Sequence, residues 1–200
     1  MLPLAFLLRR RAHLPSMRDL FDISPIAGLA LREAVIGEDE EHALLRRCEA
    51  LELTPFQFQG FEGKRLTRSF GWRYDFTAGT VSAAPPIPEW LLAVRERAAL
   101  AFDRDPARFE QALVIRYDPG AGIGWHRDRP QFDEVIGVSL ANPVVMAFRR
   151  RRADGKFDRV KVPLAPRSAY LLTGAVRSDW QHGIADHPAL RFSLTFRSLR

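Results

Sequence analysis

The spacing of hydrophobic positions predicts two helices among mixed strands in the first part of the chain. Hydrophobic residues recur with helical periodicity in EDEEHALLRRCEAL (38–51) and in IPEWLLAVRERAALAF (87–102). The first segment places its acids before its arginines, an order that complements the helix dipole. In the second segment Pro88 stands near the start, where a helix tolerates proline. Each segment is therefore predicted to be a helix.

After Asp105-Pro106 the pattern changes to short β-rich runs separated by Gly, Pro, Asn and Asp. The runs are QALVIRY (111–117), EVIGVSL (134–140), PVVMAFRRR (143–151), RVKVPL (159–164), SAYLLT (168–173) and LRFSLTFR (190–197). Asp154-Gly155, between two of them, is a strong hairpin signal. The pattern predicts an α+β, mainly β fold, a double-stranded β-helix or jelly roll, with the two helices covering one sheet on the N-terminal side.

Composition indicates an ordinary globular protein, with 46% hydrophobic and 27% charged residues. The length of 200 residues fits a loose N-terminal tail at 1–20 followed by a single domain at 21–200. A lone cysteine, Cys48, excludes an internal disulfide and fits a reducing compartment. The apolar run at the N-terminus precedes its arginines, the reverse of a secretory signal, and no apolar run approaches ~20 residues. We therefore expect a cytoplasmic protein that does not enter a membrane.

The formal charge of +6 favours an anionic partner such as nucleic acid. A bias toward arginine can also arise from GC-rich coding alone, so the charge leaves both explanations open. The run Arg149 to Arg152 has the same ambiguity, because only alternate members of a strand share a face. These arginines either grip phosphates or form a solvated hairpin, and the solvated hairpin is the simpler interpretation.

The stretch GWHRDRP (124–130) carries the first candidate chemistry. In a strand, His126 and Asp128 would point the same way, as a buried hydrogen-bonded pair, a base with its orienting carboxylate, or two metal ligands. Of the other histidines, His182 is the best candidate for a third ligand, with His187 as the alternative. Two histidines and one carboxylate with open positions are typical of non-haem Fe(II) oxygenases. An HxD pair alone is weak evidence, so the rest of the chain has to decide.

The strand RFSLTFR (191–197) supplies a second observation. Its alternation places Arg191, Ser193, Thr195 and Arg197 on one face and three apolar side chains on the core face. Two guanidiniums on an inner face are costly unless they meet an anion, and arginine binds carboxylates in bidentate fashion. Such an anion beside an Fe(II) site would be 2-oxoglutarate. The alternative is an edge strand with its polar face in water.

Taken together, four motifs resemble the AlkB-like Fe(II)/2-oxoglutarate dioxygenases over roughly residues 56–200. In chain order they are Tyr117-Asp118-Pro119-Gly120, GIGWHRD (122–128), TGAVRSDWQHGI (173–184) and RFSLTFR (191–197). The resemblance implies one dioxygenase domain, with a substrate-lid and helix region at about 56–100 and a jelly-roll catalytic core at about 110–200.

Carried over residue by residue, the resemblance implies the following roles. The ligands of Fe(II) would be His126, Asp128 and His182. The residues that bind 2-oxoglutarate, which is consumed together with O2, would be Tyr117, Arg191, Ser193 and Arg197. The residues in the lid region that contact the substrate would be Trp72, Arg73 and Tyr74, although a core-facing strand explains that stretch equally well.

The implied activity is oxidative demethylation of alkylated bases in single-stranded or flipped-out DNA or RNA, by a chain that we expect to be a monomer. Three positions depart from the best-known repair members: Ile115 and Ser193 replace asparagines, and Pro130 replaces an acid that reads the base. These departures affect cosubstrate affinity and base recognition more than oxygenase chemistry. Two alternatives stay open: an oxygenase that acts on protein, and a non-catalytic module that binds nucleic acid.

Overall fold

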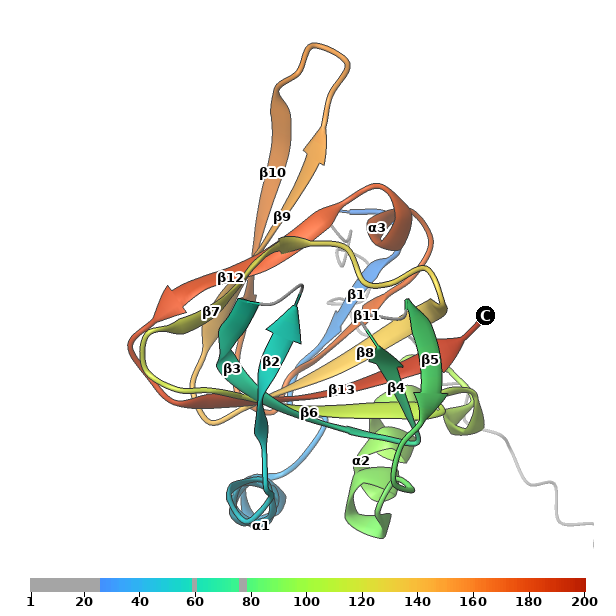
Figure 1. Cartoon of the computed structure of the whole chain (residues 1–200), viewed down its shortest axis with the longest axis vertical. Coiled ribbons are helices and arrows are strands. Elements are labelled where there is room, and N and C mark those ends of the chain that lie inside the picture. Colours follow the sequence, from blue (N-terminus) through green and yellow to red (C-terminus); the bar gives the residue numbers. More distant parts are fainter. Residues whose placement is uncertain (1–25, 59–60, 76–78) are drawn as a thin grey trace, which may run out of the picture.

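In the computed structural model, which describes residues 26–58, 61–75 and 79–200, the β-rich part of the chain forms eight strands in two sheets. The strands are β6 (Gln111–Tyr117), β7 (Ala121–His126), β8 (Phe132–Leu140), β9 (Val144–Arg151), β10 (Phe157–Leu164), β11 (Ala169–Leu172), β12 (Gln181–His187) and β13 (Arg191–Leu199). The larger sheet contains the order β11-β8-β13-β6, and the smaller sheet has the order β10-β9-β12-β7. Apart from the β9–β10 pair, successive strands alternate between the two antiparallel sheets, which confirms the predicted jelly roll (Figure 1).

The first part of the chain extends the larger sheet at both edges. Strand β1 (Leu29–Arg32) pairs with β11, while β3 (Phe61–Phe70) pairs with β6 and β2 (Thr54–Phe58) pairs with β3. Strands β4 (Trp72–Asp75) and β5 (Thr80–Ala83) form a separate two-stranded hairpin. The predicted tail at 1–20 lies outside the described residues.

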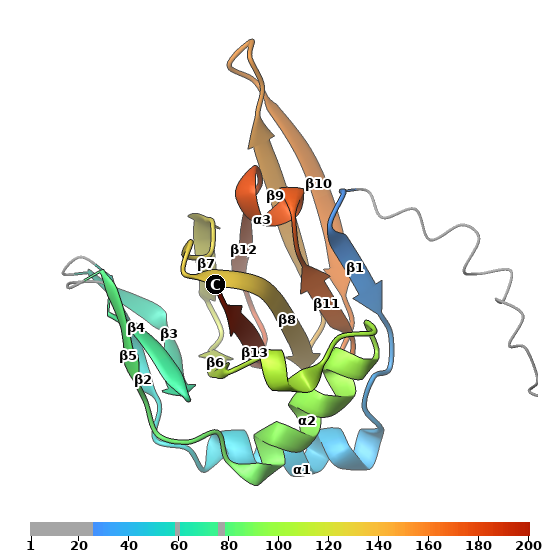
Figure 2. The ribbon, with the colours of Figure 1, turned by 90° about the vertical axis from the view of Figure 1, so that its right-hand side faces the viewer.

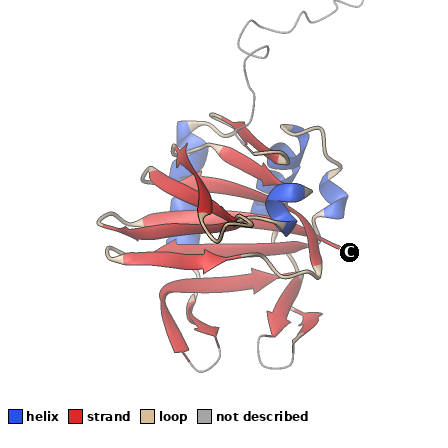
Figure 3. Cartoon of the chain, turned by 90° about the horizontal axis from the view of Figure 1, so that it is seen from above, coloured by secondary structure: helices blue, strands red, loops and turns tan. Residues whose placement is uncertain are grey.

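Both predicted helices are present, as α1 (Glu38–Glu49) and α2 (Glu89–Leu100), and they cover the outer face of the larger sheet (Figure 2). Seen from above, the helices lie toward one side of the strands (Figure 3). Leu91 and Val94 of α2 are buried in one cluster with Val138 and Leu194 of the sheet. Shorter helical turns are η1 (Pro106–Arg108) and α3 (Ala175–Ser178). Among the described residues, no helix has the length and apolar character needed to cross a membrane.

Strand β13 shows the alternation that its sequence predicts. Its apolar side chains Phe192, Leu194 and Phe196 are fully buried against the helices. The intervening polar side chains point into the space between the two sheets, where Arg191 and Arg197 line a cavity. The strand is therefore central rather than an edge strand with a solvated polar face.

Strands β9 and β10 form the hairpin predicted from Asp154-Gly155, and it projects beyond the rest of the molecule (Figure 1). Gly155 has φ of +80°, the left-handed conformation that such a turn requires.

Candidate metal centre and cosubstrate pocket

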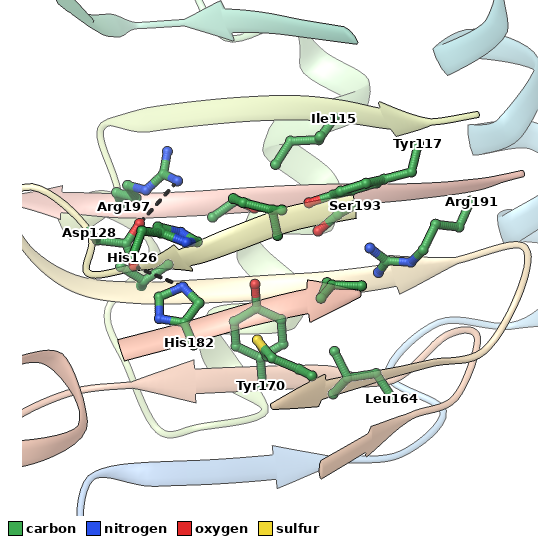
Figure 4. Close-up of a pocket in the computed structure, with 15 residues that line it drawn as sticks. Ile115, Tyr117, His126, Asp128, Leu164, Tyr170, His182, Arg191, Ser193 and Arg197 are labelled. Atoms are coloured by element: carbon green, nitrogen blue, oxygen red, sulfur yellow. Dashed lines mark hydrogen bonds and ion pairs between the residues drawn. The ribbon is translucent and has the colours of Figure 1, made fainter. Parts of the chain in front are cut away.

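Three side chains that are distant in sequence converge between the sheets. His126 is the last residue of β7 and lies opposite His182 of the adjacent strand β12. Asp128 follows after the end of β7, so the expectation that His126 and Asp128 share one strand is wrong: the chain turns out of the sheet before Asp128. The candidate ligand atoms of the three residues nevertheless all lie within 4.8 Å of one another (Figure 4).

Both histidines are neutral at physiological pH. Burial lowers the pKa of His126, and burial together with the nearby His126 lowers the pKa of His182 to about 3. Nδ1 of His126 lies 2.8 Å from the carbonyl oxygen of Gly124 and donates its proton to it, which leaves a lone pair on Nε2. A neutral imidazole oriented through its other nitrogen is the form that binds metal ions.

Asp128 is ionised and nearly buried, with 8% of its side chain exposed. Burial raises the pKa of this carboxyl, but Arg197, His182, His126 and Arg177 together outweigh burial and hold it below its ordinary value. Its Oδ2 atom is buried and accepts no hydrogen bond within the described chain. A buried anionic oxygen without a hydrogen bond, next to two neutral imidazoles, fits a divalent cation such as Fe(II).

Arg177 holds the loop that carries Asp128. Its guanidinium donates hydrogen bonds of 2.8 Å to the carbonyl oxygen of Asp133 and 2.6 Å to that of Phe132, and its Nη1 lies 3.4 Å from Oδ2 of Asp128. The link of Arg177 to the site depends on backbone carbonyls at the start of β8, which is distant in the sequence, so no sequence motif predicts it.

His126, Asp128 and His182 form a triad, and the cavity beside it contains a buried cation with unused hydrogen-bond donors. Arg191 is 1% exposed, its Nη2 donates to Oγ of Ser139 over 3.0 Å, and its charge lies 4.9 Å from the centre of the Tyr117 ring. Its Nε and Nη1 atoms are buried and have no hydrogen-bond partner within the described chain. A guanidinium stays charged even when buried, so these two donors create a site for an anion.

The other predicted cosubstrate residues line the same cavity, with Arg197 at the end nearer the triad (Figure 4). Arg197 donates a 3.0 Å hydrogen bond to Oε1 of Gln111, and its Nη2 lies 3.4 Å from Oδ1 of Asp128. Tyr117 and Ser193 lie toward Arg191. The structure thus brings the four residues together, while their contacts with a cosubstrate stay a prediction.

Tyr170 of β11 also points into this cavity, a placement that the sequence did not predict. Ile115, where the repair members carry an amide, lines the cavity as well and offers it no polar atom. Burial raises the pKa of Tyr170 to about 12, so its hydroxyl keeps its proton and can donate a hydrogen bond.

The lid residues lie beside the site rather than in the cavity wall. Tyr74 packs under the guanidinium of Arg129, with 4.9 Å from the guanidinium carbon to the ring centre, and Arg129 follows Asp128 directly. Arg73 is exposed and donates a 3.1 Å hydrogen bond to Ser82 of β5, while Trp72 is half-buried in the same hairpin. The β4–β5 hairpin therefore rests on the loop that carries Asp128, and substrate contact by its side chains stays a prediction.

Comparisons with known proteins agree with this geometry. Residues 39–197 match the family model described as the 2OG-Fe(II) oxygenase superfamily. The chain is 31% identical over 163 residues to the tRNA (carboxymethyluridine(34)-5-O)-methyltransferase ALKBH8 of Mus musculus, which covers 78% of this chain and 24% of the mouse protein. It is 28% identical over 124 residues to the alpha-ketoglutarate-dependent dioxygenase AlkB of Salmonella typhimurium, covering 56% of each.

The solved structure described as OsALKBH1 superimposes with a TM-score of 0.62 and 18% identity, covering 86% of this chain and 96% of the other, which supports the fold. The chain spans about a quarter of the length of the mouse relative.

Proposed function

The chain belongs to the 2OG-Fe(II) oxygenase superfamily, and from this premise we propose that it removes alkyl groups oxidatively from bases in single-stranded or flipped-out nucleic acid. The resemblance to AlkB-like dioxygenases that the four motifs indicate is confirmed by the relatives of that name. Because the chain spans only a quarter of the mouse relative, that protein's own tRNA activity is not transferred to it.

One observation carries the proposal: a single cavity holds a site for a cation and, next to it, a site for a carboxylate. The cation site is the triad, where Oδ2 of Asp128 accepts no hydrogen bond. The carboxylate site is Arg191, with two buried donors that have no partner. A simple binding module has no use for this combination, since each half is costly to bury without its ligand.

The enzyme uses Fe(II), 2-oxoglutarate and O2, as its superfamily does. His126, Asp128 and His182 would hold the iron, and Arg191, assisted by Tyr117 and Ser193, would bind the distal carboxylate of 2-oxoglutarate. Arg197 would lie near the metal-chelating end of the cosubstrate. When bound, Fe(II) and O2 would supply the oxidative decarboxylation of 2-oxoglutarate to succinate and CO2, coupled to oxidation of a substrate C–H bond.

The protein side chains bind and orient, and none has to act as an acid or base with a pKa near 7. Arg197 and Arg177 keep Asp128 ionised, and the contact of His126 with Gly124 fixes its ring. The apolar side chains Met146, Leu164 and Ile184 line the cavity and limit water there. When the oxidised carbon is an N-methyl group, the hydroxylated product breaks down and releases formaldehyde.

Nucleic acid as the substrate is supported by the charge of +6 and by the lid. A base has to leave its stack to reach a cavity between two sheets. Trp72, Arg73 and Tyr74 would then contact the strand through stacking and phosphate interactions beside the Asp128 loop.

The test offers the purified chain Fe(II), 2-oxoglutarate and O2 with one of three substrates: N-methylated single-stranded DNA, bulk tRNA or a protein extract. Formaldehyde and succinate are measured in each arm, with Asp128→Ala as the inactive control. We expect formaldehyde above the control in a nucleic-acid arm. Formaldehyde with the protein extract alone would replace this proposal with an oxygenase that acts on protein, and no succinate in any arm would overturn the oxygenase assignment for this site.

A further inference from the structure

The outer face of the smaller sheet carries a groove of about 320 Å³ at the base of the β9–β10 hairpin. We call it the hairpin groove, and it is lined by Arg127, Arg149, Arg151, Phe157 and Gln181. The register of the strands explains the set, because Arg149 lies opposite Gln181 of β12 and Arg151 lies opposite Phe157 of β10. Residues paired in this way share one face of a sheet.

Strand geometry divides the four consecutive arginines of the hairpin into two pairs. Arg150 lies 3.0 Å from a carboxylate oxygen of Asp158, and Arg152 lies 3.9 Å from the other oxygen of the same carboxylate. Arg149 and Arg151, on the opposite face, have no carboxylate within ion-pair distance among the described residues, and Arg127 has none either. The hairpin therefore neutralises one face and leaves the groove face positively charged.

Aromatic rings lie between the cations of the groove face. The guanidinium carbon of Arg149 lies 4.4 Å from the centre of the Trp125 ring and 4.8 Å from that of Phe157. The guanidinium carbon of Arg159 lies 5.5 Å from the same Phe157 ring centre. Trp125 is nevertheless 39% exposed, so Arg149 covers only part of this large ring and leaves apolar surface open to a ligand. Arg149 also donates a 2.7 Å hydrogen bond to Oε1 of Gln181, so its guanidinium is held against the aromatic rings before any ligand binds.

The groove and the metal site are built from alternate residues of one segment. His126 and Asp128 face the cavity between the sheets, whereas Trp125 and Arg127 face outward. A polymer bound in the groove therefore reaches the rim of the catalytic cavity.

We propose that the hairpin groove binds the backbone and one or more bases of a single-stranded nucleic acid next to the target base. Phosphates would pair with Arg127 and Arg151, and a base would stack on Trp125. Alternating cations and flat rings suit a strand with phosphates and bases better than a purely acidic partner, which would leave Trp125 uncovered. The inference rests on the proposed function, because it supplies the strand that this function demethylates.

The test measures binding of a fluorescein-labelled, unmethylated 20-nucleotide single-stranded RNA by anisotropy across a range of salt concentrations. Arg151→Gln and Arg152→Gln remove the same charge from neighbouring exposed positions of one hairpin, so they form a matched pair. We expect Arg151→Gln to weaken binding about 3–10-fold and to reduce the slope of log Kd against log salt by about 0.7. Arg152→Gln should stay within about twofold of the parent chain.

A second variant separates stacking from charge. Trp125→Ala should weaken binding while leaving the salt slope unchanged, because it removes a ring and no cation. Equal effects of Arg151→Gln and Arg152→Gln would show that only net charge matters and would overturn the groove. The groove proposal would also be overturned if the parent chain did not bind the RNA, or if its Kd did not change with salt concentration.

The two proposals fail in different ways. Formaldehyde release from a methylated trinucleotide, too short to fill the groove, tests the catalytic site alone. Release from that substrate with no difference between the two arginine variants would overturn the groove and leave the demethylase. No release from any methylated nucleic acid, with the predicted difference in RNA binding, would overturn the demethylase and support the groove.

Discussion

Gly137 of β8 lies directly opposite Tyr170 of β11, and the phenol ring occupies the space that any side chain at Gly137 would need. A Cβ atom at position 137 would overlap with ring atoms of Tyr170. The glycine is thus required for close packing rather than for an unusual backbone conformation, and it allows the tyrosine to lie across the larger sheet and point into the catalytic cavity (Figure 4).

Gly137→Ala should displace the Tyr170 ring within the cavity. We expect a loss of about 1–3 kcal/mol in the free energy of unfolding, from overpacking, and a several-fold rise in the KM for 2-oxoglutarate. Chemical denaturation and succinate formation measure the two effects. In a Tyr170→Ala background the same substitution should cost much less, because the overlapping ring is gone. Additive effects of the two substitutions would contradict the account.

Arg191→Ala should raise the KM for 2-oxoglutarate roughly 100-fold, because it removes the buried cation that has two donors without partners. Initial rates of succinate formation at increasing 2-oxoglutarate concentration measure it. Arg152→Ala, on the exposed hairpin and outside the cavity, is the control and should change the KM less than about twofold. If both substitutions changed the KM equally, Arg191 would have no special role in cosubstrate binding.

Metal binding should depend weakly on pH in the range where free histidines titrate. The pKa values of His126 and His182 are both lowered, so neither ring gains a proton that competes with the metal near pH 6.5. We expect the Kd for Mn(II), measured by electron paramagnetic resonance, to rise less than about 10-fold between pH 7.5 and 5.5, because His182 does not titrate in this range and His126 titrates below its ordinary pKa. Two histidines with ordinary pKa values would weaken binding about 100-fold over that range. A loss of Mn(II) affinity centred near pH 6.5 would contradict the lowered pKa values.

Arg177→Met should weaken metal binding about 10–100-fold, because Asp128 loses an ion pair and two backbone carbonyls at the start of β8, just after the Asp128 loop, lose their hydrogen bonds. The loss should grow as the pH falls, since the pKa of Asp128 rises without the arginine. Arg108→Met is the control, because among the described residues Arg108 forms ion pairs with Asp133 and Glu134 at the start of β8 and none with Asp128. A pH-independent loss of similar size in both variants would indicate a purely structural role for Arg177.

The sequence predicted those parts of the site that depend on strand periodicity. The alternation in RFSLTFR separates the buried phenylalanines from the cavity-facing arginines, because a period of two allows no other division. The predicted helices and the Asp154-Gly155 hairpin follow from equally local signals.

Features that depend on how distant segments pair were not predictable in this way. Strand β7 ends at His126, the last residue paired with β12, so Asp128 lies off the strand. The contact between Gly137 and Tyr170 depends on the register of two strands, and that of Arg177 with Asp128 depends on a loop from another part of the chain. The division of Arg149 to Arg152 into two faces also needed the register, which shows which pair meets Asp158.

In the proposed function, one cavity couples consumption of 2-oxoglutarate to demethylation of nucleic acid. Its most direct test follows 2-oxoglutarate turnover and the release of ¹³C-formaldehyde together, on single-stranded RNA or DNA that carries ¹³C-labelled N-methyl bases. We expect close to one formaldehyde per succinate for the parent chain and neither product for His126→Ala or Asp128→Ala, with both variants still folded. Formaldehyde release that persisted in these variants, or succinate formation that methylated nucleic acid failed to stimulate, would contradict it.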